Sequence, residues 1–377
     1  MIRLYFLQAF YHLRENPIIT WVSILGTAMA ICMIMVLVIT FQVRLVDCEP
    51  EVNRSRTLYV PYMSVKQKGN SDNESANASM SVRTGRECFR ALSMPEAVTL
   101  ASGVYRVRAS VPSRSKATAD MVQTDEAFWT IFSFHFLSGE AFTKADCDAG
   151  LTRAVLDATT ARRLFGTTDA VGHTVQLDYV DYTVAGVVAD VSMLATAAYA
   201  QIWVPYTAAG AEAMSWQNDT MGPMHAIILA RSSADFDAIR EETELLRKKY
   251  NDGLQDVEVF YRGQPDTQLA YLYRRWYAEP DVPGVMLRYA IVVIILLLVP
   301  AVNLSGMTLS RMRRRMAEIG VRKAFGATGG ELMRQVFFEN LVLTLLAGIV
   351  GLALSYVAAF APVSYTHLRA HETLMNL

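Results

Sequence analysis

Three long apolar stretches constrain this sequence more than any other feature. They cover residues 18–41, 289–309 and 336–361, and the first contains no charged side chain. An α-helix needs about 20 consecutive apolar residues to cross the hydrocarbon core of a bilayer. Each stretch reaches that length, so the sequence predicts a membrane protein with three transmembrane helices.

The first stretch is predicted to be a retained anchor rather than a cleaved signal peptide. Its apolar run is too long for a signal peptide, and residues 40–43 do not form a small-residue cleavage site. Asn16 and Pro17 are typical of a helix start, because Asn caps free amides and Pro suits the first turn. Residues 1–17 interleave apolar and basic side chains, which indicates an amphipathic helix on the inner membrane face. The plainer alternative is a continuation of the first span.

Basic residues predict the orientation. Short loops rich in Arg and Lys stay in the cytoplasm. The loop between the second and third stretches carries Arg311, Arg313, Arg314, Arg315, Arg322 and Lys323 against Glu318 and Glu331. Arg3 and Arg14 place the N-terminus on the same side. We therefore expect a multi-pass protein of the cell inner membrane, with a cytoplasmic N-terminus and residues 44–284 in the periplasm.

The predicted fold class is α-helical transmembrane segments plus a large α+β extracytoplasmic domain of two subdomains. The net charge of -1 gives no field that would attract nucleic acid, so no nucleic-acid partner is expected. The expected boundaries are a lead at 1–17, spans at 18–43, 285–309 and 333–361, a periplasmic domain at 44–284 with a β-rich insert at about 150–222, a cytoplasmic coupling loop at 310–332, and an atypical tail at 362–377 that resembles a cloning or assembly artefact.

Alternating patterns in the periplasmic segment predict strand–helix–strand units on both sides of the insert. The expected strands cover residues 56–61, 104–111, 172–177, 182–188, 201–205, 225–230 and 257–261, and the expected helices cover 158–164 and 235–250. Ser93 and Glu96 have capping-box spacing and predict a helix start. The polar residues 66–81 predict a mobile loop. The aromatic run at 126–142 favours packing between subdomains over a hydrophobic substrate surface.

The sequence gives no motif for catalysis. It lacks Walker A, His-Glu-x-x-His and Gly-x-Ser-x-Gly patterns. His367 and His371 stand four apart, but they lie in the atypical tail and are not expected to bind metal. Cys32 falls in an apolar run, whereas Cys48, Cys88 and Cys147 lie where a disulfide is chemically allowed. We therefore expect no catalytic, cofactor-binding or metal-binding residues, and we leave a disulfide open.

The loop at 310–332 carries the functional signal. Met312, Met316, Ile319 and Lys323 recur at helical spacing, and Gly326 is suited to end a helix. A second capping box, from Thr328 to Glu331, restarts the chain into the third span. Arginines beside spans fix topology in any membrane protein. That role does not explain a short helix that ends at a glycine and is followed by a cap.

Residues 318–327, Glu-Ile-Gly-Val-Arg-Lys-Ala-Phe-Gly-Ala, resemble the signature of MacB/FtsX-like ABC transporter permeases. Residues 303–305, the run from 154 to 188 and the lead into the first span are also similar to that family. The resemblance covers the chain to about residue 361. It implies a MacB-like periplasmic core domain and a non-catalytic membrane subunit that pairs with an ATPase.

The resemblance also implies mechanotransmission. ATP-driven closure of two ATPases would push the cytoplasmic helix ends and so move the periplasmic domains. The residues expected to contact the ATPase are Met316, Glu318, Ile319, Gly320, Val321, Arg322, Lys323 and Gly326. Expected partners are an ABC ATPase subunit, a second permease copy, and a periplasmic adaptor or outer-membrane channel. The expected substrate is amphipathic: a peptide, a lipoprotein or a drug.

Two features leave alternatives open. The family usually has four spans whereas three are predicted here, and the tail is unlike the family, so we expect a C-terminal truncation. An FtsX-like regulator of cell-wall hydrolases would share the same loop. A membrane-anchored receptor without an ATPase would not need a capped helix between two spans.

Overall fold

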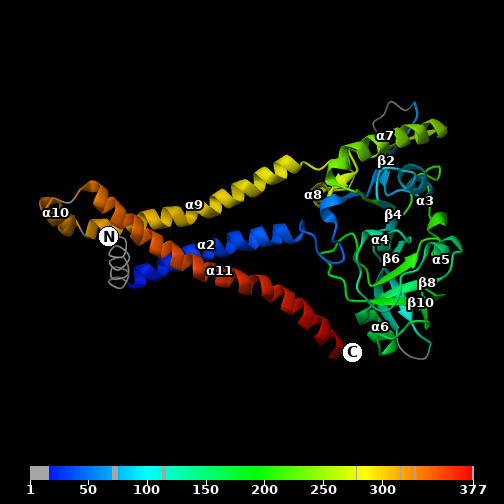
Figure 1. Ribbon diagram of the computed structural model, residues 1–377, viewed down its shortest axis with the longest axis horizontal. Coiled ribbons are helices and arrows are strands. Elements are labelled where there is room, and N and C mark those ends of the chain that lie inside the picture. The colour runs from blue at the N-terminus through cyan, green and yellow to red at the C-terminus, as the bar shows by residue number, and fades with distance from the viewer. Residues whose placement is uncertain are drawn as a thin grey trace. The chain divides into compact units, whose positions relative to one another are not determined.

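The structure is a computed structural model that describes residues 17–69, 75–112, 116–276, 278–314, 316–326 and 328–375. The chain forms two compact units (Figure 1). The helical unit contains the residues up to Val43 and from Pro283 onward, and the α/β domain comprises Arg44–Val282. The predicted lead at 1–17 lies, up to residue 16, outside the described residues.

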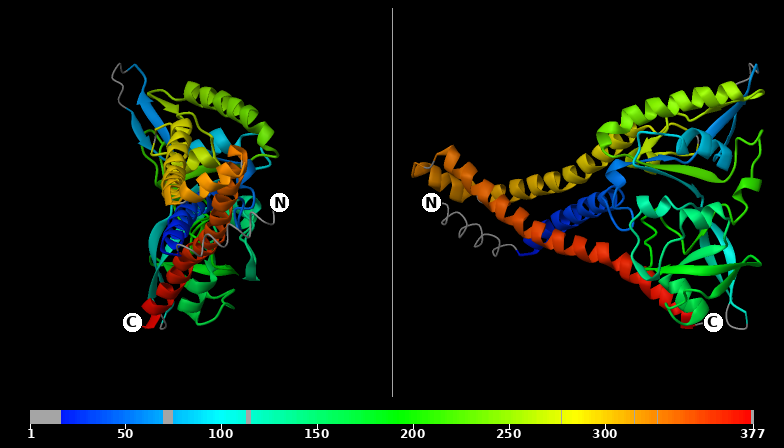
Figure 2. Two further views of the ribbon diagram at one scale, coloured as in Figure 1. Left: turned by 90° about the vertical axis from the view of Figure 1, so that its left-hand side faces the viewer. Right: turned by 45° about the vertical axis from the view of Figure 1, so that its right-hand side comes forward.

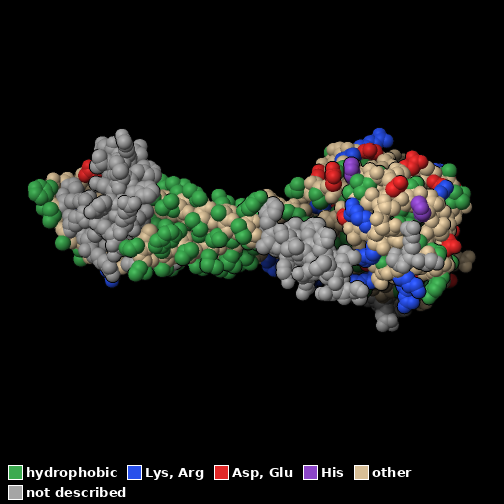
Figure 3. Space-filling model, turned by 90° about the horizontal axis from the view of Figure 1, so that it is seen from below, with side chains coloured by type: hydrophobic (Ala, Val, Ile, Leu, Met, Phe, Trp, Pro, Cys, Tyr) green, Lys and Arg blue, Asp and Glu red, His purple; other side chains and the backbone are tan. Residues whose placement is uncertain are grey.

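The helical unit consists of α2 (Pro17–Val43), α9 (Val282–Arg314), α10 (Met316–Ala324) and α11 (Gly329–Met375). Within the described residues, three segments are long and apolar enough to cross a membrane: Thr20–Val43, Val282–Ser310 and Gly329–Ala358. Figure 3 shows hydrophobic side chains over the surface of these helices, whereas charged side chains gather on the α/β domain. A helix satisfies its own backbone hydrogen bonds, and these helices also present apolar side chains, so they are suited to a bilayer. The three predicted apolar helices are confirmed.

Helices α2 and α11 pack side by side through small residues (Figure 1, Figure 2). Ala28 is fully buried against Val342, Leu343 and Ala347. A Cβ on Gly351 would lie 2.7 Å from the Ala28 carbonyl oxygen, so the two backbones approach closely at this point. Close approach at small residues is a main source of helix association in membranes. A further polar link joins α9 to α11, where the Thr308 hydroxyl lies 3.0 Å from the Asn340 side-chain oxygen.

The α/β domain contains three sheets. The four-stranded sheet has the order β14 (Asp266–Thr267), β1 (Thr57–Val60), β12 (Met224–Leu229), β4 (Ala97–Ser102). The three-stranded sheet has the order β13 (Val257–Phe260), β2 (Met63–Gln67), β3 (Ala76–Ala78). Around them lie α3 (Val82–Gly85), η1 (Arg54–Arg56), η2 (Arg86–Arg90), η3 (Ala211–Ala213), η4 (Ser233–Asp235), α7 (Phe236–Gly253) and α8 (Gln268–Tyr273). Ile239 and Tyr250 of α7 are buried in one core with Val257 and Val259 of β13.

The seven-stranded sheet has the order β7 (Phe136–Gly139), β10 (Val180–Val188), β8 (Arg153–Asp157), β11 (Ile202–Pro205), β6 (Lys116–Thr124), β5 (Tyr105–Ser110), β9 (Thr174–Leu177). Because β9 also pairs with β10, six of these strands close into a small barrel, and we call this subdomain the barrel. Helices α4 (Phe128–Ile131), α5 (Lys144–Asp148) and α6 (Ala158–Phe165) lie between its strands in the chain.

The barrel begins earlier than the β-rich insert predicted at about 150–222. Its first strand starts at Tyr105 and its last strand ends at Pro205. The hairpin of β5 and β6 belongs to it because β6 pairs in parallel with β11, far along the chain. Strand patterns reveal that a strand exists, but this pairing is a long-range contact that local patterns do not encode.

Most expected strands and helices of the α/β domain are confirmed, including the long helix α7. Two local predictions are wrong. Residues 93–96 form a bend, because the Glu242 carboxylate on α7 accepts hydrogen bonds from the Ser93 amide at 2.9 Å and hydroxyl at 2.6 Å. Residues 66–81 are not one loop, because β2 and β3 pair there as a hairpin, with residues 70–74 outside the described residues.

One buried core joins the barrel to the four-stranded sheet. Phe128, Phe132, Phe142 and Trp203 contribute their rings to this core, which also contains Tyr59 of β1. The Phe128 and Phe132 centroids are 4.7 Å apart in an edge-on arrangement, the kind of aromatic packing that fills protein cores. The prediction that the aromatic run packs between subdomains is confirmed.

The antiparallel pair of β7 and β10 has no room for a side chain at Gly186. A Cβ on Gly186 would lie 2.6 Å from the Glu140 carbonyl oxygen, whereas a Cβ on Gly253 would meet no atom within 4 Å. We expect Gly186→Ala to lower the free energy of unfolding by about 1–3 kcal/mol and Gly253→Ala to change it by less than about 0.5 kcal/mol. Tryptophan-fluorescence unfolding of the full chain in detergent checks this. Equal effects of the two substitutions on the free energy of unfolding would contradict the close approach of Gly186 to the Glu140 backbone.

Candidate functional site: α10 and the connections to the α/β domain

Helix α10 is a separate short helix between two long apolar ones. It covers Met316–Ala324, and α9 ends before it at Arg314. Gly326 has a φ of +94°, a conformation that favours glycine, and its amide bonds to the Lys323 carbonyl at 3.0 Å. The Thr328 amide then donates to the Glu331 carboxylate at 3.0 Å, at the start of α11. The predicted glycine stop is confirmed, and so is the Glu331 half of the predicted cap.

All eight residues expected to contact an ATPase lie on α10 or directly after it. They are Met316, Glu318, Ile319, Gly320, Val321, Arg322, Lys323 and Gly326. The side chains of Met316 and Val321 are 69% and 56% exposed, and Ile319 is partly buried. For Glu318 and Arg322 only the backbone is described. The segment therefore presents apolar side chains at the surface between two apolar helices.

Phe325 is the strongest surface feature of this segment, and the sequence prediction did not select it. Its side chain is 88% exposed. Phe325 follows Val321 by four residues, and its amide bonds to the Val321 carbonyl at 3.1 Å, so both side chains lie on one face of the helical turn. The sequence signal that could have indicated this exposure is its position just before Gly326, because fewer neighbouring turns cover a side chain at the end of a helix.

A buried ion pair fixes the chain just after α2. The Arg54 and Glu51 side chains are 0% and 1% exposed, and their charged atoms are 2.6 Å apart. Arg54 also donates to the carbonyls of Val46 at 2.9 Å and Leu194 at 2.7 Å. The second Glu51 oxygen accepts from the Ala197 amide at 2.8 Å and the Ala198 amide at 3.0 Å. The pair thus fastens the chain after α2 to residues 192–198, a stretch that we call the 192–198 loop and that is part of the connection from β10 to β11 in the barrel.

A second buried ion pair fixes the chain just before α9. Arg274 and Asp266 are 1% and 3% exposed and form two hydrogen bonds, one of them at 2.8 Å. Arg274 also donates to the carbonyls of Ala278 at 2.9 Å and Arg262 at 3.0 Å. Asp266 lies on β14, which pairs with β1 in the four-stranded sheet. The first ion pair thus ties the chain after α2 to the barrel, whereas the second ties the chain before α9 to the four-stranded sheet, into which the chain after α2 also continues through β1.

Two family models match this chain. Residues 20–246 match the family model of the MacB-like periplasmic core domain, which is more than half of the chain. The chain belongs to the MacB/FtsX-like ABC transporter permease family. Residues 290–367 of this permease match the model of the FtsX-like permease C-terminal, and the match passes the predicted start of the atypical tail at residue 362.

Named relatives of this permease are fused proteins. The Pyoverdine export ATP-binding/permease protein PvdT of Pseudomonas aeruginosa is 28% identical over 60% of this chain and 33% of that protein. The Macrolide export ATP-binding/permease protein MacB of Chromobacterium violaceum is 26% identical over 64% of this chain and 35% of that protein. The chain thus spans about a third of the length of these relatives. The crystal structure of the periplasmic region of MacB from Actinobacillus actinomycetemcomitans aligns with 54% of this chain and 90% of that chain, at 18% identity and a TM-score of 0.38.

The cysteines of this permease are free thiols in the structure. Cys88 and Cys147 are buried in two different cores, so they do not form the disulfide left open by the sequence, and Cys48 is also free. Burial raises the pKa of the Cys88 and Cys147 thiols to about 12, so both stay protonated and unreactive at neutral pH. Within the described part of the chain, no cluster of three or more His, Cys, Asp or Glu residues could hold a metal ion.

A cavity of about 170 Å³ lies where the barrel meets the four-stranded sheet. Tyr59 and Tyr271 line it with rings stacked at a centroid distance of 4.4 Å. His225 of β12 also lines it, with its Nε2 2.9 Å from the Ser79 hydroxyl. Burial lowers the pKa of His225 to about 4, so the imidazole is neutral at physiological pH. The junction between the subdomains is therefore incompletely filled.

His225 predicts a pH dependence of stability. The folded state resists protonation down to about pH 4, whereas the unfolded state gains a proton near pH 6.5. The contribution of neutral His225 to the free energy of unfolding is therefore fully present above pH 6.5 and is lost as the pH falls toward 4. Buried Asp125 and Asp157, whose pKa values are raised to about 6, act in the opposite sense, so the comparison must be with a variant. From about pH 8 to about pH 5, denaturant titrations should show the wild type losing up to about 2 kcal/mol more than His225→Gln. Parallel pH profiles of the free energy of unfolding for the wild type and His225→Gln would contradict this prediction.

Proposed function

We propose that this chain is the membrane subunit of an ABC exporter that works by mechanotransmission and whose ATPase is a separate chain. The observation that carries the proposal is α10, a capped helix between two apolar helices that exposes Met316, Val321 and Phe325. Exposed apolar side chains on a rigid element form the usual centre of a protein interface. A partner that docks there can push on the ends of α9 and α11 together.

The two buried ion pairs give that push a route. Movement of α2 reaches the barrel through Glu51, Arg54 and the 192–198 loop. Movement of α9 reaches the four-stranded sheet through Arg274 and Asp266. Because the chain after α2 also continues into β1 of the four-stranded sheet, a displacement of α2 would act at the junction of the two subdomains, where the cavity lies. A packed boundary of this kind has discrete arrangements, which is what transmission over a distance requires.

We propose an amphipathic substrate, exported toward the outside. The relatives are named for export of pyoverdine and of macrolides, and both names describe those proteins. A membrane-anchored receptor without an ATPase is not favoured, because such a receptor would not need a capped helix with exposed apolar side chains between two apolar helices. An FtsX-like regulator would use the same push on the α/β domain. The regulator predicts that candidate substrates leave the ATPase rate of the complex unchanged, whereas the exporter predicts that they raise it.

The exposed face of α10 should be required for binding the ATPase. Phe325→Asp places a charge in the centre of the proposed apolar contact, and we expect about ten-fold less ATPase activity to co-purify with the tagged chain from its native membranes. The matched control is Leu245→Asp on α7, where a leucine that is 66% exposed receives the same charge. We expect the control to retain the ATPase. Retention by Phe325→Asp, or equal loss by both variants, would refute α10 as the docking helix.

The proposed orientation places α10 in the cytoplasm and residues 44–284 outside. Tyr179 is 80% exposed in the α/β domain and Phe325 is 88% exposed after α10. With the native cysteines replaced by alanine, Tyr179→Cys should react with a membrane-impermeant maleimide on intact spheroplasts. Phe325→Cys should react only after the membrane is permeabilised. The reverse labelling pattern would rule out this topology and, with it, the proposed coupling.

A further inference from the structure

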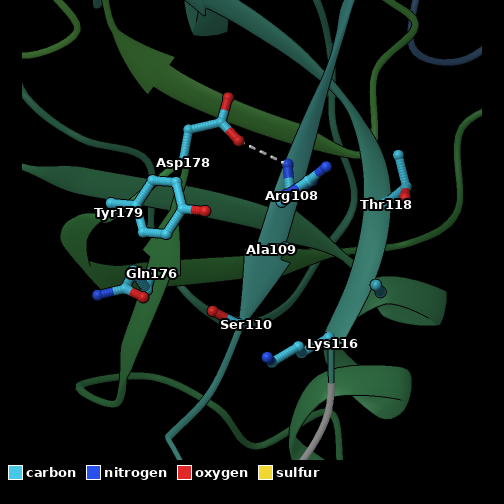
Figure 4. Close-up of a pocket in the computed structure, with 9 residues that line it drawn as sticks. Arg108, Ala109, Ser110, Lys116, Thr118, Gln176, Asp178 and Tyr179 are labelled. Atoms are coloured by element: carbon cyan, nitrogen blue, oxygen red, sulfur yellow. Dashed lines mark hydrogen bonds between the residues drawn. The ribbon is translucent and has the colours of Figure 1, made fainter.

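A groove of about 420 Å³ lies on the barrel, where β5, β6 and the β9–β10 hairpin meet (Figure 4). In this view Tyr179 and Gln176 of the hairpin lie on one side of Ala109, and Thr118 and Lys116 of β6 lie on the other. Arg108 and Ser110 come from β5 between them. The groove is remote in sequence from α10 and from both buried ion pairs, so the coupling mechanism does not account for it.

Two cations of the groove lie on one face of the sheet. Arg108 is paired across the strands with Thr118, and Ser110 with Lys116, so Arg108 and Lys116 are diagonal neighbours about 7–8 Å apart at their backbones. Neither forms an ion pair with any residue that the structure describes. Arg106, two positions before Arg108 on the same strand, does have an acidic partner, since its guanidinium lies 3.6 Å from the Asp120 carboxylate. The groove thus holds two positive charges and one negative charge, because the Asp178 carboxylate also lines it and accepts a hydrogen bond from the Arg108 backbone amide at 2.9 Å. Neither the Arg108 guanidinium nor the Lys116 ammonium forms an ion pair with it, so both cations stay available to a ligand.

The turn that carries Tyr179 into the groove is strained. Asp178 and Tyr179 have φ values of 44° and 73°, a region that bulky side chains rarely adopt. The two-residue turns of hairpins normally use Asn-Gly or Asp-Gly here. The turn is held by the Arg108 backbone, whose amide donates to the Asp178 carboxylate at 2.9 Å and whose carbonyl accepts from the Asp178 amide at 3.0 Å. A tyrosine in place of glycine costs stability and leaves a ring that is 80% exposed at the groove.

We propose that this groove binds an anionic ligand that carries a carboxylate or phosphate group beside a planar ring. Arg108 and Lys116 bind the anionic group, since charge-assisted hydrogen bonds are the strongest such contacts at a surface. The Ser110 and Thr118 hydroxyls donate to its remaining oxygens. The Tyr179 ring stacks on the planar part of the ligand. The strain at residue 179 is retained because only a side chain there can cover the ligand.

In the test, the full chain in detergent is titrated with three small probes: benzoate, phenyl phosphate and uncharged benzamide. Ligand-observed NMR measures the binding of each probe. Saturable binding of benzoate or of phenyl phosphate, stronger than that of benzamide, is expected. The stronger of the two anions identifies the group for which the site is built. Arg108→Gln and Lys116→Gln should each weaken binding about ten-fold. Arg106→Gln, the matched control on the same strand face, should change it by less than about two-fold.

Tyr179 provides a second, independent arm. Tyr179→Gly should weaken binding while raising the thermal midpoint of the α/β domain, because glycine adopts the positive φ without strain. Tyr179→Phe should preserve binding, since it keeps the ring. The proposal is overturned if no probe shows saturable binding, if benzamide binds as tightly as the anions, if Arg106→Gln and Arg108→Gln weaken binding equally, or if Tyr179→Gly leaves binding unchanged. None of these results bears on ATPase docking at α10.

Discussion

Two buried ion pairs fix the chain of this permease where it leaves α2 and where it enters α9. An isolated buried charge is costly, and removal of one member of such a pair typically costs about 3–5 kcal/mol. Glu51 and Arg54 therefore stay together, and with them the loop at residues 192–198 stays attached to the chain that leaves α2. Arg274 and Asp266 do the same for the chain that enters α9. The connection from α2 is thus fastened at the junction of both subdomains, and the connection to α9 is fastened to the four-stranded sheet.

The aromatic core between the subdomains complements these attachments. Phe128, Phe132 and Trp203 fill most of the junction, whereas the cavity lined by Tyr59, Tyr271 and His225 leaves part of it open. Dense cores resist small deformations and shift between discrete packings. A junction that is mostly filled but has one cavity is suited to two such packings. The proposed exporter would use α10 to choose between them, with the ATPase as the source of the push.

Much of the fold and part of the site could be read from the sequence. The apolar stretches, the turn at Gly326 and helix α7 follow from local patterns, because hydrophobic periodicity and backbone preference act within a few residues. The bend at Ser93 was predicted as a helix start because its true partner, Glu242, lies on a distant helix. The early start of the barrel was missed for the same reason, since β6 joins it only through β11. The exposure of Phe325 could not be predicted, because sequence spacing does not give how far a side chain stands out from the surface.

The sequence by itself predicted three apolar helices long enough to cross a membrane, and a helix stop and cap between the last two of them. These follow from side-chain transfer energies and local capping, which need no knowledge of the remaining chain. Only the tertiary structure decided that Glu51 meets Arg54 beside the 192–198 loop, that Arg274 meets Asp266, and that Arg108, Lys116 and Tyr179 share one groove. The contact of Arg54 with the 192–198 loop and the groove join segments far apart in the chain, and the two ion pairs are buried only when the whole domain closes around its core.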